Sequence, residues 1–291
     1  MKISPIMYMG CKKDLIKKGL LNYFPNNIKT FYEPFSGSAI VSMNVNAEKY
    51  ELSDINYHLI ELYDLFKTKS SEEIIHYGHK IIEEYKLFSK SIDNRELDKY
   101  KDSFNKYRDY YNKYKNPMDL FVLSLFSFSQ SIRFNNDDLY DSTIGNRSFS
   151  KNTEKNIFDG CKFFSQDNVN FYKRSFTDID INVLNENDFI YFDPPYTQTN
   201  SFYNKFWTEE NDNQLFNICE KLNDKNIKWG ISDVFQNRGN VNEHIINWCK
   251  KNNWTVIHFN KNYSFNGCSD SETDEVYICN YQVEKDIFEM I

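Results

Sequence analysis

The sequence predicts an α/β fold, a mixed sheet with helices on both faces and an inserted, mostly helical region. Short apolar runs alternate with helical patterns in residues 1–67 and again in 166–291, which is typical of such a sheet. Residues 68–165 between them are not needed by the sheet. The chain of 291 residues is 40% apolar, enough for one α/β domain with a smaller domain inserted into it.

The first element is a strand, a turn of small residues and the start of a helix. We assign the strand to Thr30–Phe35, the turn to Ser36–Ala39 and the helix start to Ile40–Val45. Small residues let the backbone approach a ligand, and a helix N-terminus offers free N–H groups. Asp54, at the end of the next predicted strand Tyr50–Asp54, is placed to bind ribose hydroxyls. The single glycine in the turn favours a nucleoside without phosphates.

The inserted region, residues 68–165, is predicted to be mostly helical. Residues 72–116 are rich in Glu, Lys, Ile and Tyr and contain no proline, and residues 118–129 are strongly apolar. We therefore expect one domain from residues 1–67 and 166–291, and a second from 68–165.

The most informative segment is Phe192–Thr197, with the sequence FDPPYT. It follows an apolar, aromatic run at 187–192 that predicts a buried central strand, and ligands of open α/β sheets bind where such strands end. The Asp193 carboxylate and the Pro194 carbonyl could each accept a hydrogen of an amino group, which turns the nitrogen lone pair towards a methyl donor. The prolines fix these acceptors, and Tyr196 offers a face on which a base can stack. The alternative is a strand that ends by chance in a turn.

The remaining elements complete the alternation. Helices are predicted near residues 209–223 and 242–251, and strands at residues 227–232 and around Val256 and Val276.

These motifs, in this order, resemble the Dam-type DNA adenine-N6 methyltransferases of the D12 class, most closely the short phage-encoded members. The resemblance covers most of the chain and is carried by Tyr8–Lys12, Glu33–Gly37, Ser53–Asp54, Asp193–Tyr196, Tyr203–Trp207, Lys228–Ser232 and Thr273–Ile278. It implies a Rossmann-like class I methyltransferase sheet with a target-recognition insertion. It also implies methyl transfer from S-adenosyl-L-methionine to an adenine flipped out of duplex DNA, within GATC, with S-adenosyl-L-homocysteine as product and no metal.

The resemblance also assigns residues. Asp193, Pro194 and Tyr196 would be catalytic. The cofactor would be bound by Tyr8, Lys12, Phe35, Gly37, Asp54, Phe176 and Asp193.

The same resemblance assigns DNA contacts. Phe128 would fill the space left by the flipped base, Arg133 would bind a guanine and Arg147 a phosphate. Ser129, Ser131, Asn135 and Lys205 are the other candidates. The chain departs from the family at Met7 and at Thr143–Gly145, so a target other than GATC stays open. As alternative residue roles, Phe128 would be a core side chain and Arg133 a surface ion-pair partner.

Charge and composition set further expectations. The net charge is −7, unusual for a DNA-binding protein, but residues 1–30 and 147–174 are locally basic. The six cysteines are scattered, which favours a reducing cytoplasm without a zinc site or disulfides. We expect no signal peptide, membrane span or obligate protein partner. An RNA or protein-glutamine methyltransferase, or a catalytically silent DNA-binding relative, remains an alternative.

Overall fold

The computed structural model describes residues 1–196, 207–259 and 273–283. The chain forms two compact units. The sheet unit comprises Lys12–Ser36, Val45–Ile55 and Arg174–Ile291, and the helical unit comprises Met1–Cys11, Gly37–Asn44 and Asn56–Lys173. The predicted boundaries at residues 67 and 165 both fall within the helical unit, and the division into a catalytic and a recognition domain stays a prediction.

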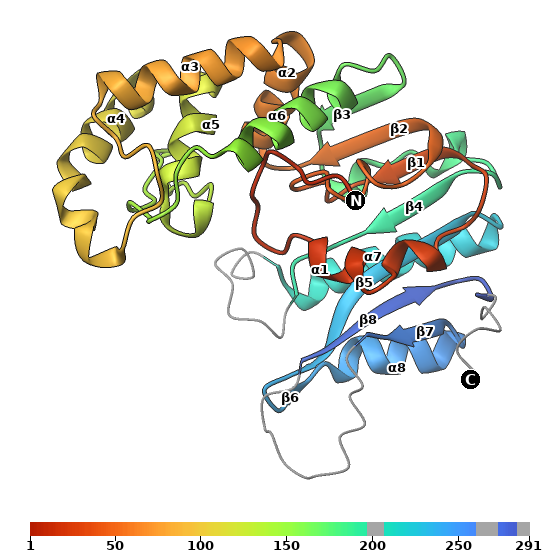
Figure 1. The fold of residues 1–291 in the computed structure, drawn as a ribbon. Coiled ribbons are helices and arrows are strands. Elements are labelled where there is room, and N and C mark those ends of the chain that lie inside the picture. Colours follow the sequence, from red (N-terminus) through yellow and green to blue (C-terminus); the bar gives the residue numbers. More distant parts are fainter. Residues whose placement is uncertain (197–206, 260–272, 284–291) are drawn as a thin grey trace, which may run out of the picture. The chain divides into compact units, whose positions relative to one another are not determined.

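The sheet unit contains a mostly parallel sheet (Figure 1). Its strands run in the order β2-β1-β4-β5-β8-β7, and β6 pairs with β5. β1 is parallel to β2 and β4, and β4 is parallel to β5, whereas β8 is antiparallel to both of its neighbours. The strands are β1 (Ile28–Glu33), β2 (Ala47–Asp54), β4 (Phe189–Phe192), β5 (Lys228–Asn237), β6 (Asn240–Val241), β7 (Thr255–His258) and β8 (Asp274–Cys279). This mixed sheet agrees with the expected class I methyltransferase fold.

Both faces of the central strands are covered by apolar side chains. On one face, α7 (Glu209–Asp224) and α8 (Glu243–Asn252) join a core in which the Phe216 and Trp248 rings stack with centroids 4.1 Å apart. On the other face, Phe24 contacts the rings of Phe189, Tyr191 and other aromatic residues. All four residues of β4 are buried, which explains its continuous apolar sequence.

Short helices complete the sheet unit. They are α1 (Lys13–Lys17), η1 (Leu20–Tyr23), η4 (Phe176–Asp178) and η5 (Ile181–Val183).

Gly230 shows why one strand position must lack a side chain. A Cβ at this residue of β5 would lie 2.1 Å from the hydroxyl oxygen of Tyr277. The Tyr277 hydroxyl is itself 2.6 Å from that of Tyr281. Any larger residue at 230 would therefore displace a buried, hydrogen-bonded ring.

The helical unit carries the helices expected from residue 68 onward, together with earlier segments of the chain. Its elements are α2 (Tyr57–Thr68), α3 (Ser71–Glu84), η2 (Asn94–Lys99), α4 (Lys101–Tyr114), α5 (Pro117–Phe126), η3 (Phe128–Gln130), α6 (Lys151–Phe164) and β3 (Val169–Lys173). Local sequence explains where two of these helices begin. Ser70 and Glu73 form a capping box at the start of α3, and Asn116 caps α5 ahead of Pro117. Asp119 ties α5 to its neighbours, because the Tyr77 and Tyr107 hydroxyls donate to its carboxylate at 2.6 and 2.8 Å.

The predicted helix start at Ile40–Val45 is wrong, because these residues form turns instead. Ala39 has a positive φ of 57°. The Asn44 side chain donates to the Ile40 carbonyl at 2.8 Å and so competes with a backbone bond that would extend the helix.

Within the described part of the chain, no helix combines the length and apolar character required to cross a membrane.

Candidate functional site

Several predicted site residues lie at the carboxyl-end edge of the parallel strands. Asp54 ends β2, Phe35 follows β1, and Asp193 follows β4. β1 is the switch point, because it pairs with β2 on one side and β4 on the other. The Ser36 N–H and hydroxyl both donate to the Ser53 carbonyl at 3.0 Å, which fixes the turn after β1 beside the end of β2.

Among the described residues, the Asp193 carboxylate contacts Lys12 and Tyr196 of the sheet unit. Lys12 Nζ is 2.6 Å from Oδ2, and the Tyr196 hydroxyl donates to Oδ1 at 3.1 Å. The Lys12 side chain is only 5% exposed and that of Asp193 17%. Lys12 Nζ also lies 4.9 Å from the centroid of the Tyr196 ring. The structure thus brings together the predicted catalytic carboxylate, the predicted aromatic face and a lysine predicted to bind the cofactor.

Electrostatics make the Asp193 charge depend on Lys12. Burial raises the pKa of Asp193 above its ordinary value, and the Lys12 ammonium opposes that rise. Burial also raises the pKa of Tyr196, with the Asp193 charge adding to the effect, so the Tyr196 hydroxyl remains a protonated donor.

A second buried carboxyl group was not among the predicted site residues. Asp233 lies on β5, two residues beyond Ile231, which pairs with Phe192. Burial raises the pKa of Asp233 to about 8, and the Val234 N–H donates to Oδ1 at 2.6 Å. Its signal in the sequence was an acidic residue inside the apolar run at 229–235.

Aromatic rings gather beside the turn after β1. The Phe35 and Phe176 rings stack with centroids 5.2 Å apart, and Trp207 is 5.5 Å from Phe35 and 5.3 Å from Phe176. The Trp207 indole N–H donates to Asp212 Oδ1 at 2.7 Å. Together with the Asp54 carboxylate, these rings suit a nucleoside that offers an aromatic base and ribose hydroxyls. Trp207 was not among the predicted site residues, although it ends the Tyr203–Trp207 motif that carries the family resemblance.

Tyr8 and Gly37 belong to the helical unit, whereas the other cofactor candidates belong to the sheet unit. The Tyr8 hydroxyl accepts a hydrogen bond from Asn56 Nδ2 at 3.3 Å. The Gly37 carbonyl accepts from the Tyr63 hydroxyl at 2.7 Å. Tyr8 is thus joined to the N-cap residue of α2, and Gly37 to a residue within α2.

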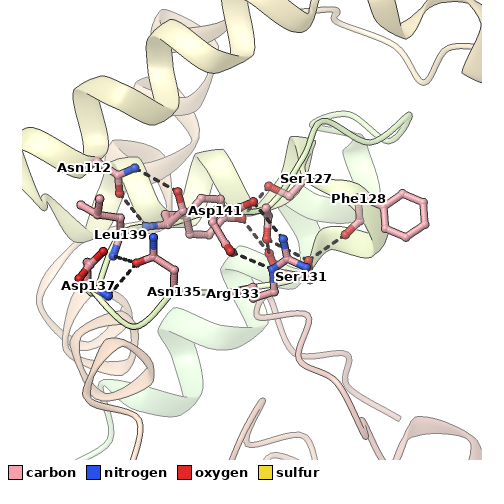
Figure 2. A network of polar contacts seen from close by, with 11 residues as sticks. Asn112, Ser127, Phe128, Ser131, Arg133, Asn135, Asp137, Leu139 and Asp141 are labelled. Atoms are coloured by element: carbon pink, nitrogen blue, oxygen red, sulfur yellow. Dashed lines mark hydrogen bonds and ion pairs between the residues drawn. The ribbon is translucent and has the colours of Figure 1, made fainter. Parts of the chain in front are cut away.

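Five of the predicted DNA contacts, Phe128, Ser129, Ser131, Arg133 and Asn135, lie in a hairpin-like segment of the helical unit, residues 127–145, which we call the recognition hairpin (Figure 2). Arg147 follows two residues beyond it. Antiparallel bridges join Ser127 to Ile144 and Phe134 to Tyr140. At its tip, Asn135 Oδ1 accepts from the backbone N–H groups of Asp137 and Leu139 at 3.0 and 2.9 Å. These bonds give the predicted DNA contact Asn135 a role in shaping the turn.

Polar side chains also hold the two arms of the hairpin in place. Asn112 donates to the Tyr140 carbonyl at 3.0 Å and accepts from the Tyr140 N–H at 2.7 Å. The Tyr140 hydroxyl donates to the Ser131 carbonyl at 2.7 Å. A Cβ at Gly145 would lie 2.5 Å from the Ser127 carbonyl oxygen, so the two arms approach too closely for a larger residue.

Phe128 projects from this segment and is 65% exposed. Ser129 and Gln130 follow it with positive φ angles of 54° and 52°, a strained turn for residues other than glycine. The Ser131 hydroxyl donates to the Phe128 carbonyl at 2.9 Å, and Arg147 Nη1 donates to Gln130 Oε1 at 3.3 Å. Phe128 is therefore not a core side chain in this structure.

Arg133 is bound to Asp141 within the hairpin. Its Nε donates to Asp141 Oδ1 at 2.7 Å, and its Nη2 donates to the Asp141 carbonyl at 3.1 Å.

Lys205, the last predicted DNA contact, lies outside the described residues.

Asp138 anchors the hairpin tip to α2, a contact that the sequence did not reveal. Its carboxylate accepts from the Tyr57 hydroxyl at 2.5 Å and contacts His58 Nε2 at 2.8 Å. The His58 ring stacks on Phe134 with centroids 3.6 Å apart. Burial lowers the pKa of His58 despite the neighbouring carboxylate.

A family model described as D12 class N6 adenine-specific DNA methyltransferase matches residues 8–266. The chain belongs to this family.

Three curated relatives of this D12-class chain are modification enzymes. It is 34% identical to the type II methyltransferase M.FokI of Planomicrobium okeanokoites over 96% of its length, and 32% identical to the modification methylase StsI of Streptococcus sanguinis over 97%. It is 26% identical to the modification methylase LlaI of Lactococcus lactis subsp. lactis over 87%. The chain covers 43%, 43% and 40% of these proteins, respectively, which is less than half of each. The expected closeness to phage-encoded enzymes stays a prediction.

Proposed function

We propose that this chain methylates the N6 amino group of an adenine in duplex DNA, with S-adenosyl-L-methionine as methyl donor and GATC as the target. Family membership supports the reaction class. The observation that carries the proposal is the largely buried Asp193 carboxylate, which pairs with Lys12 just after the end of β4 and begins the segment Asp193–Tyr196.

The chemistry required at this site is polarisation of a weak nucleophile. The adenine amino lone pair is delocalised into the ring, so it must be drawn out of the ring plane before it can attack a methyl group. Asp193 and the Pro194 carbonyl supply two acceptors for the two amino hydrogens, and the Lys12 ammonium favours the charged form of the carboxylate. Preorganised acceptors of this kind lower the barrier because they need no rearrangement during the reaction.

The residues at the ends of β1 and β2 fit the methyl donor. The stacked Phe35 and Phe176 rings suit its adenine, and Asp54 suits its ribose. When bound, S-adenosyl-L-methionine supplies a methyl group that is already activated on sulfur. The protein therefore has to bind, orient and polarise the amino group, without a covalent enzyme intermediate.

Recognition of duplex DNA is assigned to the recognition hairpin. An exposed ring on a strained turn, as at Phe128, suits insertion into a base stack. Arg133 is a donor suited to guanine, and Arg147 is proposed to bind phosphate.

The test is incubation of the purified chain and S-adenosyl-L-methionine with unmethylated DNA, followed by single-molecule sequencing of modified adenines. We expect N6-methyladenine confined to GATC. Methylation at another motif would retain the reaction and reject GATC. Transfer to RNA or protein glutamine instead of DNA would reject the duplex substrate, and cofactor binding without any transfer would indicate a catalytically silent relative.

A further inference from the structure

We propose that Asp141 is a specificity-determining positioning residue, which holds Arg133 in the orientation required to bind a guanine. This inference rests on the proposed function, because it deepens the DNA-recognition step. It concerns a residue that was not among the predicted site residues.

The first support is the geometry of the Arg133–Asp141 contact (Figure 2). Arg133 Nε donates to Asp141 Oδ1 at 2.7 Å, and Nη2 donates to the Asp141 carbonyl at 3.1 Å. The Asp141 N–H donates back to the Arg133 carbonyl at 3.1 Å. Backbone and side chain of Asp141 together therefore fix the plane of the guanidinium group.

The second support is which edge of the guanidinium these contacts use. Nε and one N–H of Nη2 face Asp141, so the remaining N–H groups of Nη1 and Nη2 are directed away from it. Two such donors form a fork that matches O6 and N7 of guanine in the major groove. An arginine that is already held in one plane loses less conformational freedom when it binds a base.

The third support is that the hairpin has other bonds that maintain its shape. Asn135 closes the tip, and Asn112 holds Tyr140 from both sides. The Arg133 and Asp141 side chains are 43% and 38% exposed, and ion pairs at such exposure add little to stability. The pair is therefore better explained by orientation of Arg133 than by folding of the hairpin.

The experiment compares Asp141→Ala with Asp137→Ala in the full chain. Both variants remove one negative charge from the same hairpin, but only Asp141 contacts Arg133. The readout is kcat/KM on the duplex motif mapped for the unaltered chain, and on duplexes in which each guanine in turn is replaced by 7-deazaguanine, which lacks the N7 acceptor. The Tm of each variant is measured as a check on folding. Asp141→Asn, which keeps the side-chain volume, is a second variant at this position.

We expect the unaltered chain and Asp137→Ala to lose about tenfold in kcat/KM at one 7-deazaguanine position. Asp141→Ala should lose most of that discrimination while Tm stays unchanged, and Asp141→Asn, whose amide oxygen can still accept from Arg133 Nε, should keep part of it. Arg133→Ala should abolish the discrimination, and adding Asp141→Ala to it should have little further effect. Full discrimination in a folded Asp141→Ala variant would overturn this inference alone. Absence of DNA methylation by the unaltered chain would instead overturn the proposed function, and this inference with it.

Discussion

The candidate active site and the recognition hairpin each contain an ion pair, in opposite surroundings. Lys12 and Asp193 are 2.6 Å apart with side chains 5% and 17% exposed, whereas Arg133 and Asp141 are 2.7 Å apart with side chains 43% and 38% exposed. A buried carboxylate has lost most of its hydration, so its charge depends on its partner. In an exposed pair water can stabilise each charge separately, and the contact mainly sets geometry. The two pairs should therefore fail in different ways when one partner is removed.

The largest effect is expected from removal of the buried carboxylate. Asp193→Ala should lower kcat/KM for DNA methylation by about 10³-fold, because an acceptor for the amino group is lost from a preorganised site. DNA binding, measured by fluorescence anisotropy, should persist. Glu186→Ala, an exposed acid of the same unit, is the matched control and should keep full activity. Substantial activity in a folded Asp193→Ala variant would contradict the catalytic role.

Lys12→Met should lower activity by about 100-fold at pH 7, because the Asp193 carboxylate would lose the cation that favours its charged form. Burial already raises the pKa of Asp193, and Lys12 opposes that rise, so the variant raises the pKa further. A carboxylate that must be ionised is active above its pKa, and its activity is lost as the pH falls. The acidic limb of the pH–rate profile should therefore move to higher pH, with partial recovery in alkaline buffer.

The control for this shift is Lys13→Met, which removes the neighbouring lysine and leaves the Asp193 ion pair intact. Its pH profile should match that of the unaltered chain. Superimposable profiles for Lys12→Met and the unaltered chain would show that Lys12 does not govern the Asp193 charge.

Phe128→Ala tests the exposed side of the comparison and should lower kcat/KM by about tenfold, the size of a lost stacking contact. Tm should not change, because the ring is 65% exposed. The defect should shrink on a duplex with a mismatch opposite the target adenine, where flipping costs less. Phe158→Ala removes another exposed ring of the helical unit and should have no effect; an equal loss in both variants would rule out insertion by Phe128.

The smallest effect is expected from a change in the packing of α3 against α5 in the helical unit. Tyr77→Phe removes one of the two hydroxyls that donate to Asp119 and should lower the free energy of unfolding by about 1 kcal/mol. Urea denaturation should show a lower midpoint with an unchanged slope. Tyr110→Phe, at an exposed ring on α4, should leave the midpoint unchanged. If both variants shift the urea midpoint equally, loss of the hydrogen bond to Asp119 does not explain the shift.

Much of the sheet could be predicted from local sequence. The strands at 30–35, 50–54, 187–192 and 227–232 correspond to β1, β2, β4 and β5, with ends displaced by a few residues. β4 is buried on both faces, so its apolar run is continuous and easy to recognise. Prediction failed at 40–45, where a positive φ at Ala39 and the Asn44 side chain favour turns over a helix. Neither effect appears in a hydrophobic pattern.

The sequence by itself determined the α/β class and the FDPPYT segment at a strand end, because both depend on residues close together in the chain. Only the tertiary structure decided that Lys12 binds Asp193 and that Asp138 reaches His58. It also decided that Asp141 occupies one edge of Arg133. These contacts join distant segments or the two arms of a hairpin, and their strength depends on burial. Charge state depends on burial, and side-chain orientation depends on these contacts, so residue type alone could suggest the candidates but not their partners.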